Sequence, residues 1–295
     1  MNSQMNNWVN SLPKDAQSKF KNDMQKSFSY EPKIAIFGKT GVGKSSLTNA
    51  LFGKDACQIS DVAACTRNPQ EVFLKLDGAS NGIKLLDVPG IGESSERDKE
   101  YFKLYAEILK ECDMVLWVLK GDDRTFTADE DFYNTCMKDY IEKGKPFAVA
   151  VNQIDKIEPY REWDVDGCKP GIKQEHNILQ KIFYVAEQFG DLPASLVIPV
   201  SANERYNLEK LLLTLIKKLP ANQRVLTIDN TDEKIQKREE IIMERQKSFK
   251  ESINEIIDDL PLPETIKTFG KGVVDTLSTI ATGVASVVSF FKSFW

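Results

Sequence analysis

The sequence contains few of the residues that hold structural zinc or form disulfide bonds. It has one histidine, His176, and five cysteines among 295 residues, and no two cysteines form a C-x-x-C pair. A Cys/His zinc site is therefore not expected. Unpaired thiols are typical of a reducing compartment, which favours a cytoplasmic location. The cysteines lie at positions 57, 65, 112, 136 and 168.

The chain also lacks an excess of positive charge. Its 39 Lys and Arg residues against 44 Asp and Glu residues give a net charge of −5. This balance argues against a grip on nucleic acid by bulk electrostatics, so direct nucleic-acid binding is not expected. Residues 1–17 contain no apolar stretch of the kind found in signal peptides, so a signal peptide is not expected either.

What is present is the composition of a folded globular protein. Hydrophobic residues make up 41% and charged residues 28% of the chain, so a packed core is expected. A chain of 295 residues has room for one complete α/β domain with appendages, or for two small domains.

A glycine-rich segment lies between an apolar run and a helical pattern. Residues 34–37 are apolar, as in a strand buried on both faces of a parallel sheet, and the leucines at 47 and 51 follow at helical spacing. Residues 38–45, GKTGVGKS, fit the pattern G-x-x-x-x-G-K-S/T, in which backbone N–H groups surround phosphate oxygens. Lys44 adds a positive charge at the β- and γ-phosphates, and the Ser45 hydroxyl can bind Mg²⁺. The residues of this segment predicted to bind the nucleotide are Gly38, Lys39, Thr40, Gly41, Val42, Gly43, Lys44, Ser45 and Ser46.

Strand-like and helix-like segments alternate from about residue 31 to residue 218. The alternation predicts an α/β fold, a P-loop domain with a mostly parallel six-stranded sheet and helices on both faces. Such sheets bind ligands at the C-terminal ends of their strands. A long polar connection at 157–171 is predicted to be a functional loop. The predicted strands are 33–37, 70–76, 82–88, 113–119, 146–151 and 195–200, and the predicted helices are 44–53, 97–111, 127–143, 172–189 and 205–218.

Two segments after the glycine-rich loop are placed to hold Mg²⁺ and the γ-phosphate. Thr66 lies in a segment of weak periodicity, where its hydroxyl can complete the Mg²⁺ shell when a γ-phosphate is present. Asp87 ends a predicted strand and can hold Mg²⁺ through water, and the Gly90 N–H can bond the γ-phosphate. The predicted metal ligands are thus Ser45, Thr66 and Asp87, and the predicted switch segments are 54–69 and 90–99.

Two further segments are placed to bind the base. Asn152, Gln153 and Asp155 follow the predicted strand FAVAV, and a fixed carboxylate at Asp155 can accept the N1–H and N2–H of guanine. Adenine offers neither donor and would leave a buried charge unpaired, so GTP is predicted rather than ATP. Ser201 and Ala202 end the last predicted strand, where a backbone N–H can donate to the guanine O6. Each motif is common by itself, and the prediction rests on their order and position along the chain.

At these residues the chain resembles the translation-factor-related GTPases. It looks most similar to the Era/TrmE branch, in particular to the Era-like GTPases of bacterial prophages and genomic islands. The resemblance covers about residues 31–218 and is carried by GKTGVGKSSLTNALFG, Cys65-Thr66-Arg67, DVPGIGE, NQIDKIEP and VSA. It implies a G domain that binds GTP and Mg²⁺ and hydrolyses GTP slowly to GDP and phosphate. The residues that this resemblance assigns to catalysis are Lys44, Thr66 and Gly90.

The chain departs from related GTPases at three positions. Ile91 stands where Ras-like enzymes place a glutamine that orients the attacking water, so other groups must act in hydrolysis. Gly41 stands where some members of the branch have an asparagine that recruits potassium, so potassium activation is not expected. Gln153 stands where lysine is usual, so a weaker nucleotide affinity is expected.

Both ends of the chain are predicted to be helical. Residues 5–28 predict one amphipathic helix, or two broken near Pro13, and 232–259 predict a charged helix after a polar linker at 221–231. The amphipathic stripe of 266–295 leaves several alternatives: packing on the protein, lying on a membrane as a peripheral anchor, spanning it, or forming an oligomer contact such as a homodimer. The predicted domains are a helical segment at 1–30, a GTPase domain at 31–220 and a C-terminal helical region at 221–295.

Two classes of role follow from these flanks. The chain is either a regulator of ribosome or RNA assembly, as Era is, or a dynamin-like or immunity-type GTPase that acts on a membrane or a partner through its flanking helices. A nucleotide-binding module that hydrolyses almost nothing is a third alternative.

Overall fold

The computed structural model describes residues 2–53, 70–75, 82–87, 103, 105–190 and 192–280, and for 70–75 and 82–87 it describes the backbone alone. The chain forms two compact units. We call Lys33–Leu74 with Lys84–Lys218 the α/β unit. We call Met1–Pro32, Lys75–Ile83 and Leu219–Trp295 the helical unit, in which helices from both ends of the chain come together.

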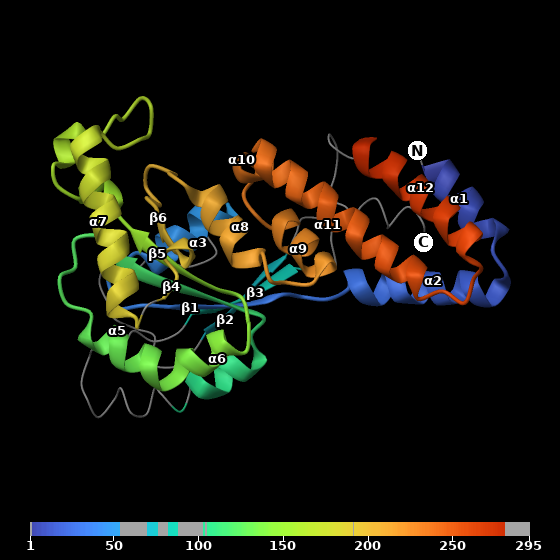
Figure 1. Cartoon of the computed structure of the whole chain (residues 1–295), viewed down its shortest axis with the longest axis horizontal. Helices are drawn as coiled ribbons and strands as arrows, with labels where there is room; N and C mark the ends of the chain where they lie inside the picture. The colour runs from blue at the N-terminus through green and yellow to red at the C-terminus, as the bar shows by residue number, and fades with distance from the viewer. Residues whose placement is uncertain are drawn as a thin grey trace. The chain divides into compact units, whose positions relative to one another are not determined.

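The α/β unit is built on a six-stranded sheet with the strand order β2-β3-β1-β4-β5-β6 (Figure 1). Strand β1 pairs in parallel with β3 and β4, β4 with β5, and β5 with β6. The sequences of β4 (MVLWVLK) and β5 (FAVAVN) are nearly all apolar because a parallel sheet is covered on both faces. The mostly parallel six-stranded sheet predicted from the sequence is confirmed. The strands are β1 Lys33–Phe37, β2 Gln70–Lys75, β3 Gly82–Asp87, β4 Met114–Lys120, β5 Phe147–Asn152 and β6 Val197–Pro199.

Helices cover both faces of this sheet (Figure 1). On one face, Trp117 of β4 packs against Phe132 with ring centroids 4.7 Å apart, and buried residues of α7 complete the same cluster. The alternate residues of the strands, such as Leu116, face the other side, where α8 contacts β4, β5 and α3. The α- and π-helical elements among the described residues of the unit are α3 Lys44–Phe52, a helix at 105–111, α5 Thr127–Phe132, the π-helical turn Tyr133–Met137, α6 Lys138–Glu142, α7 Ile172–Gln188 and α8 Leu208–Ile216.

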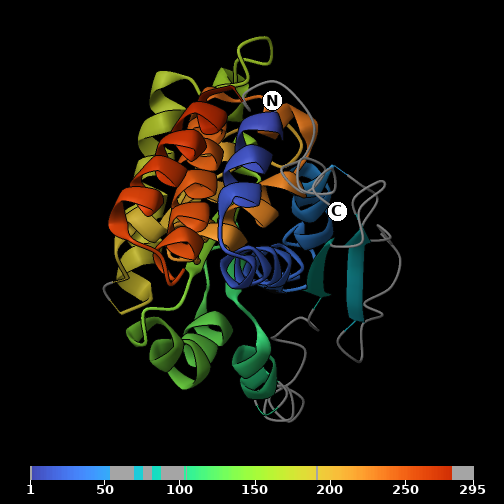
Figure 2. The same cartoon turned by 90° about the vertical axis from the view of Figure 1, so that its right-hand side faces the viewer.

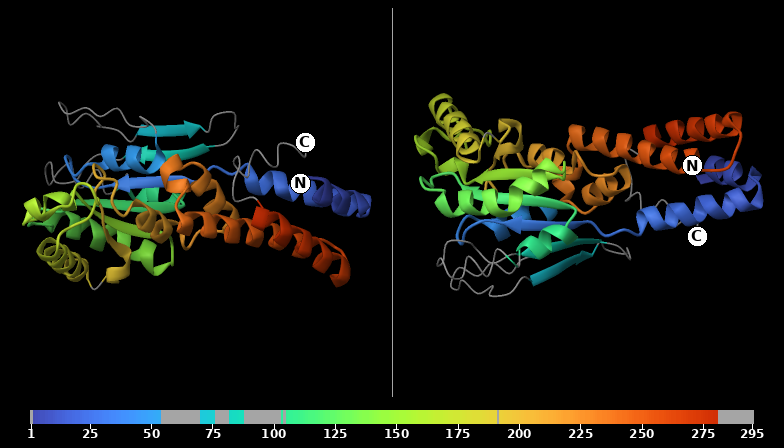
Figure 3. Two further views of the ribbon diagram at one scale, coloured as in Figure 1. Left: turned by 90° about the horizontal axis from the view of Figure 1, so that it is seen from above. Right: turned by 60° about the horizontal axis from the view of Figure 1, so that its bottom comes forward.

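The helical unit has its own apolar core. Trp8 and Phe20 meet edge to face at 5.5 Å between centroids, and Phe249 and Val274 belong to the same buried cluster. Of the two alternatives for the N-terminal segment, the structure has two helices, because Pro13 directly precedes α2. In Figures 2 and 3, α12 lies beside α11 and α1, which it contacts. The helices are α1 Asn2–Ser11, α2 Lys14–Phe28, α9 Ala221–Asp229, α10 Glu233–Gln236, α11 Glu239–Asp258 and α12 Glu264–Ile280.

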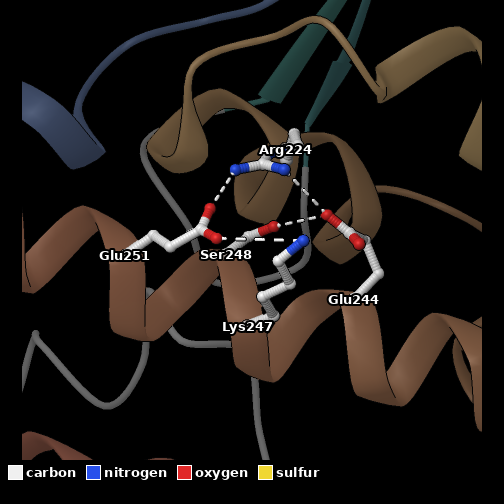
Figure 4. Close-up of polar contacts among 5 residues, drawn as sticks. All are labelled: Arg224, Glu244, Lys247, Ser248 and Glu251. Atoms are coloured by element: carbon white, nitrogen blue, oxygen red, sulfur yellow. Dashed lines mark hydrogen bonds and ion pairs between the residues drawn. The ribbon is translucent and has the colours of Figure 1, made fainter.

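The prediction of a polar linker at 221–231 is wrong. This segment contains α9, whose Val225 and Ile228 are fully buried. Its polar residues are paired inside the unit instead of facing water. Arg224 binds Glu244 at 3.0 Å and also binds Glu251, both on α11 (Figure 4). A polar composition indicated solvent here, although the polar groups belong to a partly buried network.

For the C-terminal stripe, the described part packs on the protein. Val274 and Leu277 of α12 are buried in the core of the helical unit. Gly270 allows this approach, because a Cβ at that position would overlap the ring of Trp8. Residues 281–295 lie outside the described part of the chain. Within that part, no helix combines the length and apolar character needed to cross a membrane.

Candidate functional site

The glycine-rich loop at residues 38–45, which we call the P-loop, connects β1 to α3 at the C-terminal edge of the sheet. Gly38, Gly41 and Gly43 have φ values of 144°, 83° and 88°, in the region that favours glycine. A Cβ at Gly38 would overlap the Val118 carbonyl oxygen, and a Cβ at Gly43 would lie 2.6 Å from the Asn152 side-chain nitrogen. Two of the glycines are therefore required by close contact with β4 and β5 as well as by their conformation.

Lys44 lies folded back over the P-loop. Its Nζ donates to the carbonyl oxygens of Gly38 at 2.8 Å and of Lys39 at 3.1 Å. Ser45 and Ser46 follow in the first turn of α3, where backbone N–H groups have no partner within the helix. A helix N-terminus beside a lysine is a favourable position for a phosphate. Thr40 and Gly41 lie on the exposed side of the loop.

Asn152 joins three of the predicted segments. It ends β5 and is 1% exposed. Its Nδ2 donates to the Val42 carbonyl oxygen at 3.0 Å, and its Oδ1 accepts from the Ala202 N–H at 3.1 Å. Ser201 is buried beside Ala202, and its Oγ accepts from the Glu204 N–H at 3.1 Å. The structure thus brings residues 42, 152 and 201–202 together.

Asp155 contributes a buried hydrogen-bond acceptor to the segment that follows β5. It lies in the short 3₁₀ turn Ile154–Lys156 that follows β5, and its Oδ1 is buried with no hydrogen-bond partner among the described residues. A buried carboxylate oxygen without a donor is costly, so a ligand that supplies one is favoured. Guanine carries N–H donors at N1 and N2, whereas adenine carries neither. The donor set therefore fits guanine.

Gln153 takes a left-handed conformation with φ of 61°. Its Oε1 accepts from Lys156 Nζ at 2.9 Å, and its Nε2 lies 3.5 Å from the Gly41 carbonyl oxygen. The neutral side chain therefore lies over the P-loop with a lysine ammonium attached to it.

Gln174 supports the base-binding segment and was not anticipated from the sequence. It lies in the first turn of α7 with no exposed surface, and its Nε2 donates to the carbonyl oxygens of Asp155 at 3.1 Å and of Ile157 at 2.9 Å. The neighbouring Asn177 donates to the Glu158 carbonyl oxygen at 2.7 Å. A glutamine in a helical pattern usually indicates a solvated position, so no sequence signal could have revealed this contact. The predicted loop 157–171 is ordered by an antiparallel bridge between Asp164 and Lys169.

Three of the residues predicted to bind Mg²⁺ or the γ-phosphate lie partly or wholly outside the described residues. Thr66, Gly90 and the switch segments 54–69 and 90–99 lie outside the described residues. Asp87 ends β3, where its backbone pairs with Ile36 of β1 two residues before the P-loop. Of the predicted Mg²⁺ ligands, Ser45 is the one whose surroundings are described. Among the described residues, no cluster of three or more His, Cys, Asp or Glu side chains forms another metal site.

The parallel sheet, the P-loop and the base-binding segment define a P-loop nucleotide-binding protein, and comparisons with known proteins specify the family. Residues 33–153 match the family described as 50S ribosome-binding GTPase. Residues 33–153 therefore form an Era-like P-loop GTPase domain, and the chain binds GTP and hydrolyses it to GDP and phosphate.

Relatives extend over different shares of the chain. The uncharacterized protein YkfA of Escherichia coli is 34% identical over 94% of this chain and 93% of its own length. The GTPase Era of Aquifex aeolicus is 29% identical over 66% of this chain and 59% of Era. Among solved structures, an Aquifex aeolicus Era variant bound to GDP·AlF₄⁻ is 29% identical, covers 64% of this chain and 56% of its own, and has a TM-score of 0.47. Era in complex with MgGDPNP and nucleotides 1506–1542 of 16S ribosomal RNA is 30% identical, covers 64% and 57%, and has a TM-score of 0.48.

Proposed function

We propose that this chain is a guanine-nucleotide switch whose binding site consists of residues 38–46, 152–155 and 201–202. The P-loop N–H groups and Lys44 bind the phosphates, and Asp155 binds the base next to the segment 201–202. The observation that carries the proposal is Asn152, because its amide holds the P-loop at Val42 and the base-binding segment at Ala202 in one arrangement. The buried, partnerless Oδ1 of Asp155 supports guanine as the base.

The catalytic part of the proposal assigns Ser45, Thr66 and Asp87 to Mg²⁺ and the Gly90 N–H to the γ-phosphate. These three residues would hold Mg²⁺, and the ion would supply positive charge that offsets the charge of the phosphates. Lys44 stabilises the negative charge that develops as the γ-phosphate leaves. Because Ile91 stands where a water-orienting glutamine would act, turnover without a partner is expected to be of the order of 10⁻³ s⁻¹.

Phosphate release tests this function. We expect the full chain to release phosphate from GTP with Mg²⁺, and the Lys44→Ala variant to lose this activity because the P-loop then has no cation at the phosphates. Lys110→Ala is the matched control, since Lys110 is 69% exposed on the same unit. Equal release by wild type and Lys44→Ala would mean that the activity comes from another site or a contaminant.

The helical unit is the proposed effector, and a membrane surface is the second candidate partner. Ile266 and Phe269 of α12 are 36% and 66% exposed, although other residues of this helix are buried. Flotation of the full chain with liposomes, with GDP or a non-hydrolysable GTP analogue, tests this role. The double variant Ile266→Gln/Phe269→Gln leaves the buried side of α12 intact. Loss of flotation in that variant supports a membrane surface, and no flotation in any state excludes it.

Two further candidate partners are ribosomal RNA and a second copy of the chain. A net charge of −5 does not decide RNA binding, because a local basic patch can act in an acidic protein. A gel-shift assay with ribosomal RNA in both nucleotide states separates an Era-like role from a membrane role. Sedimentation equilibrium in the same states tests for a homodimer.

A further inference from the structure

The side chain of Lys39 does not face the phosphate side of the P-loop. Its Nζ lies 2.7 Å from Asp129 Oδ2 and donates to the Thr125 carbonyl oxygen at 3.0 Å. Asp129 lies on α5, the helix that follows β4, and its side chain has no exposed surface. Its second oxygen accepts from Trp117 Nε1 on β4 at 3.3 Å. The second residue of the P-loop is therefore bound to α5 directly and to β4 through Asp129.

The burial of Asp129 makes this attachment firm. Burying a carboxylate is strongly unfavourable unless the group is paired and hydrogen-bonded. Burial raises the pKa of the Asp129 carboxyl, and the Lys39 ammonium and the Trp117 N–H act in the opposite direction by stabilising the charged form. Breaking the pair by moving Lys39 would leave an uncompensated charge in the core. The position of Lys39 is thus fixed more strongly than that of a surface lysine.

The backbone of Lys39 also helps to position the side chain of Lys44. The Lys39 carbonyl oxygen accepts from Lys44 Nζ at 3.1 Å, beside the Gly38 carbonyl oxygen at 2.8 Å. The backbone carbonyl of Lys39 therefore positions Lys44, and the side chain of Lys39 is in turn bound by Asp129. A small displacement of such a loop weakens every contact that it makes with the phosphates.

We propose that Asp129 is a positioning residue of the nucleotide site: through Lys39 it fixes the P-loop carbonyl that orients Lys44. This inference rests on the proposed function, because it requires that the P-loop bind a nucleotide phosphate. Asp129 does not touch the nucleotide in this account. It determines how well the loop is preorganised, and therefore nucleotide affinity for GDP and GTP alike.

The test is the affinity of the full chain for a fluorescent GDP analogue in the presence of Mg²⁺, with the midpoint of urea unfolding measured in parallel. Asp129→Asn keeps the volume and the oxygen that accepts from Trp117 but removes the charge that holds Lys39. Lys39→Met removes the other partner, Lys39→Arg retains the pair, and the double variant Asp129→Asn/Lys39→Met removes both. Asp131→Asn is the control, since Asp131 is exposed on the same helix.

We expect Asp129→Asn and Lys39→Met each to bind the GDP analogue about tenfold more weakly, the loss expected for one charge-assisted contact. The double variant should be no weaker than either single variant, because both remove the same interaction. Lys39→Arg, which retains the ion pair, should bind more tightly than Lys39→Met, and Asp131→Asn should bind like wild type.

Wild-type affinity in a folded Asp129→Asn variant would overturn the inference, and so would additive losses in the double variant, which would mean that Lys39 acts on the nucleotide by itself. A change in the urea midpoint with unchanged affinity would show a merely structural ion pair and also overturns it. These results differ from failure of the proposed function. In that case the wild-type chain does not bind the analogue, or Lys44→Ala binds it equally well.

Discussion

Asp155 is the residue on which the choice of base depends in the proposed site. Its carboxylate accepts two N–H groups of guanine, and Gln174 holds the backbone on which it sits by donating to the Asp155 carbonyl oxygen at 3.1 Å. A side chain that can only accept discriminates strongly against a base that presents acceptors in the same place. We therefore propose that base choice depends on one charged group and on the buried amide that supports it.

The Asp155→Asn variant should change its preference from guanine toward xanthine nucleotides. The amide nitrogen donates where the carboxylate accepted, and the xanthine ring carries an oxygen in place of the guanine amino group. Competition of GDP and XDP for a fluorescent analogue measures the change. A variant that still prefers GDP would show that Asp155 does not contact the base.

The Gln174→Leu variant should bind guanine nucleotides about tenfold more weakly, because leucine has a similar volume but leaves two partly buried carbonyl oxygens without this donor. Its preference for GDP over XDP should stay, since Asp155 is unchanged. Gln180→Leu on the same helix is the control, because Gln180 is exposed. Titration with the fluorescent GDP analogue gives both affinities. An unchanged affinity in Gln174→Leu would mean that Asp155 keeps its position without this support.

At the scale of elements, the α/β unit was predictable because its signals are local. Each strand of the sheet starts and ends within two residues of its predicted position, since runs such as FAVAVN are apolar wherever a parallel strand is covered on both faces. The P-loop was predictable because its glycines are required by φ values such as the 88° of Gly43.

The supporting residues were not predictable, because their roles arise from contacts distant in sequence. Asp129 and Lys39 are brought together by the crossover from β1 through β4 to α5. Gln174 resembles any polar helix residue until its burial is known. The same reason explains α9, which was predicted to be a linker. Its Arg224 and Asp229 have partners on α11. The sequence alone does not distinguish a polar residue with a buried partner from one that faces water.

The contribution of the Arg224 ion pairs to the stability of the helical unit can be measured. Arg224 is 13% exposed and binds two carboxylates. Arg224→Met leaves Glu244 without its cation and Glu251 with Lys247 alone at 3.9 Å, and it should reduce the free energy of unfolding by about 2 kcal/mol. Lys237→Met removes the exposed i, i+4 pair with Glu233 and should change it by less than about 0.5 kcal/mol. Urea unfolding compares the two variants. Equal effects would contradict the structural role of the network in Figure 4.

At the scale of the whole molecule, the chain combines a G domain with a helical unit formed by both of its ends. YkfA shares nearly the whole length of this chain, whereas the similarity to Era covers 66% of it. In this chain the GTPase domain is therefore combined with helices that lie outside the region of similarity to Era. Nucleotide exchange in the α/β unit and partner binding by the helical unit form the proposed switch.

The measurement that tests this account most directly is calorimetric titration of the full chain with GDP and with ADP in the presence of Mg²⁺. GDP should bind at one site and at least about a hundredfold more tightly than ADP, because ADP leaves the buried oxygen of Asp155 without a donor. Equal affinities for GDP and ADP, or no binding of either, would contradict this prediction.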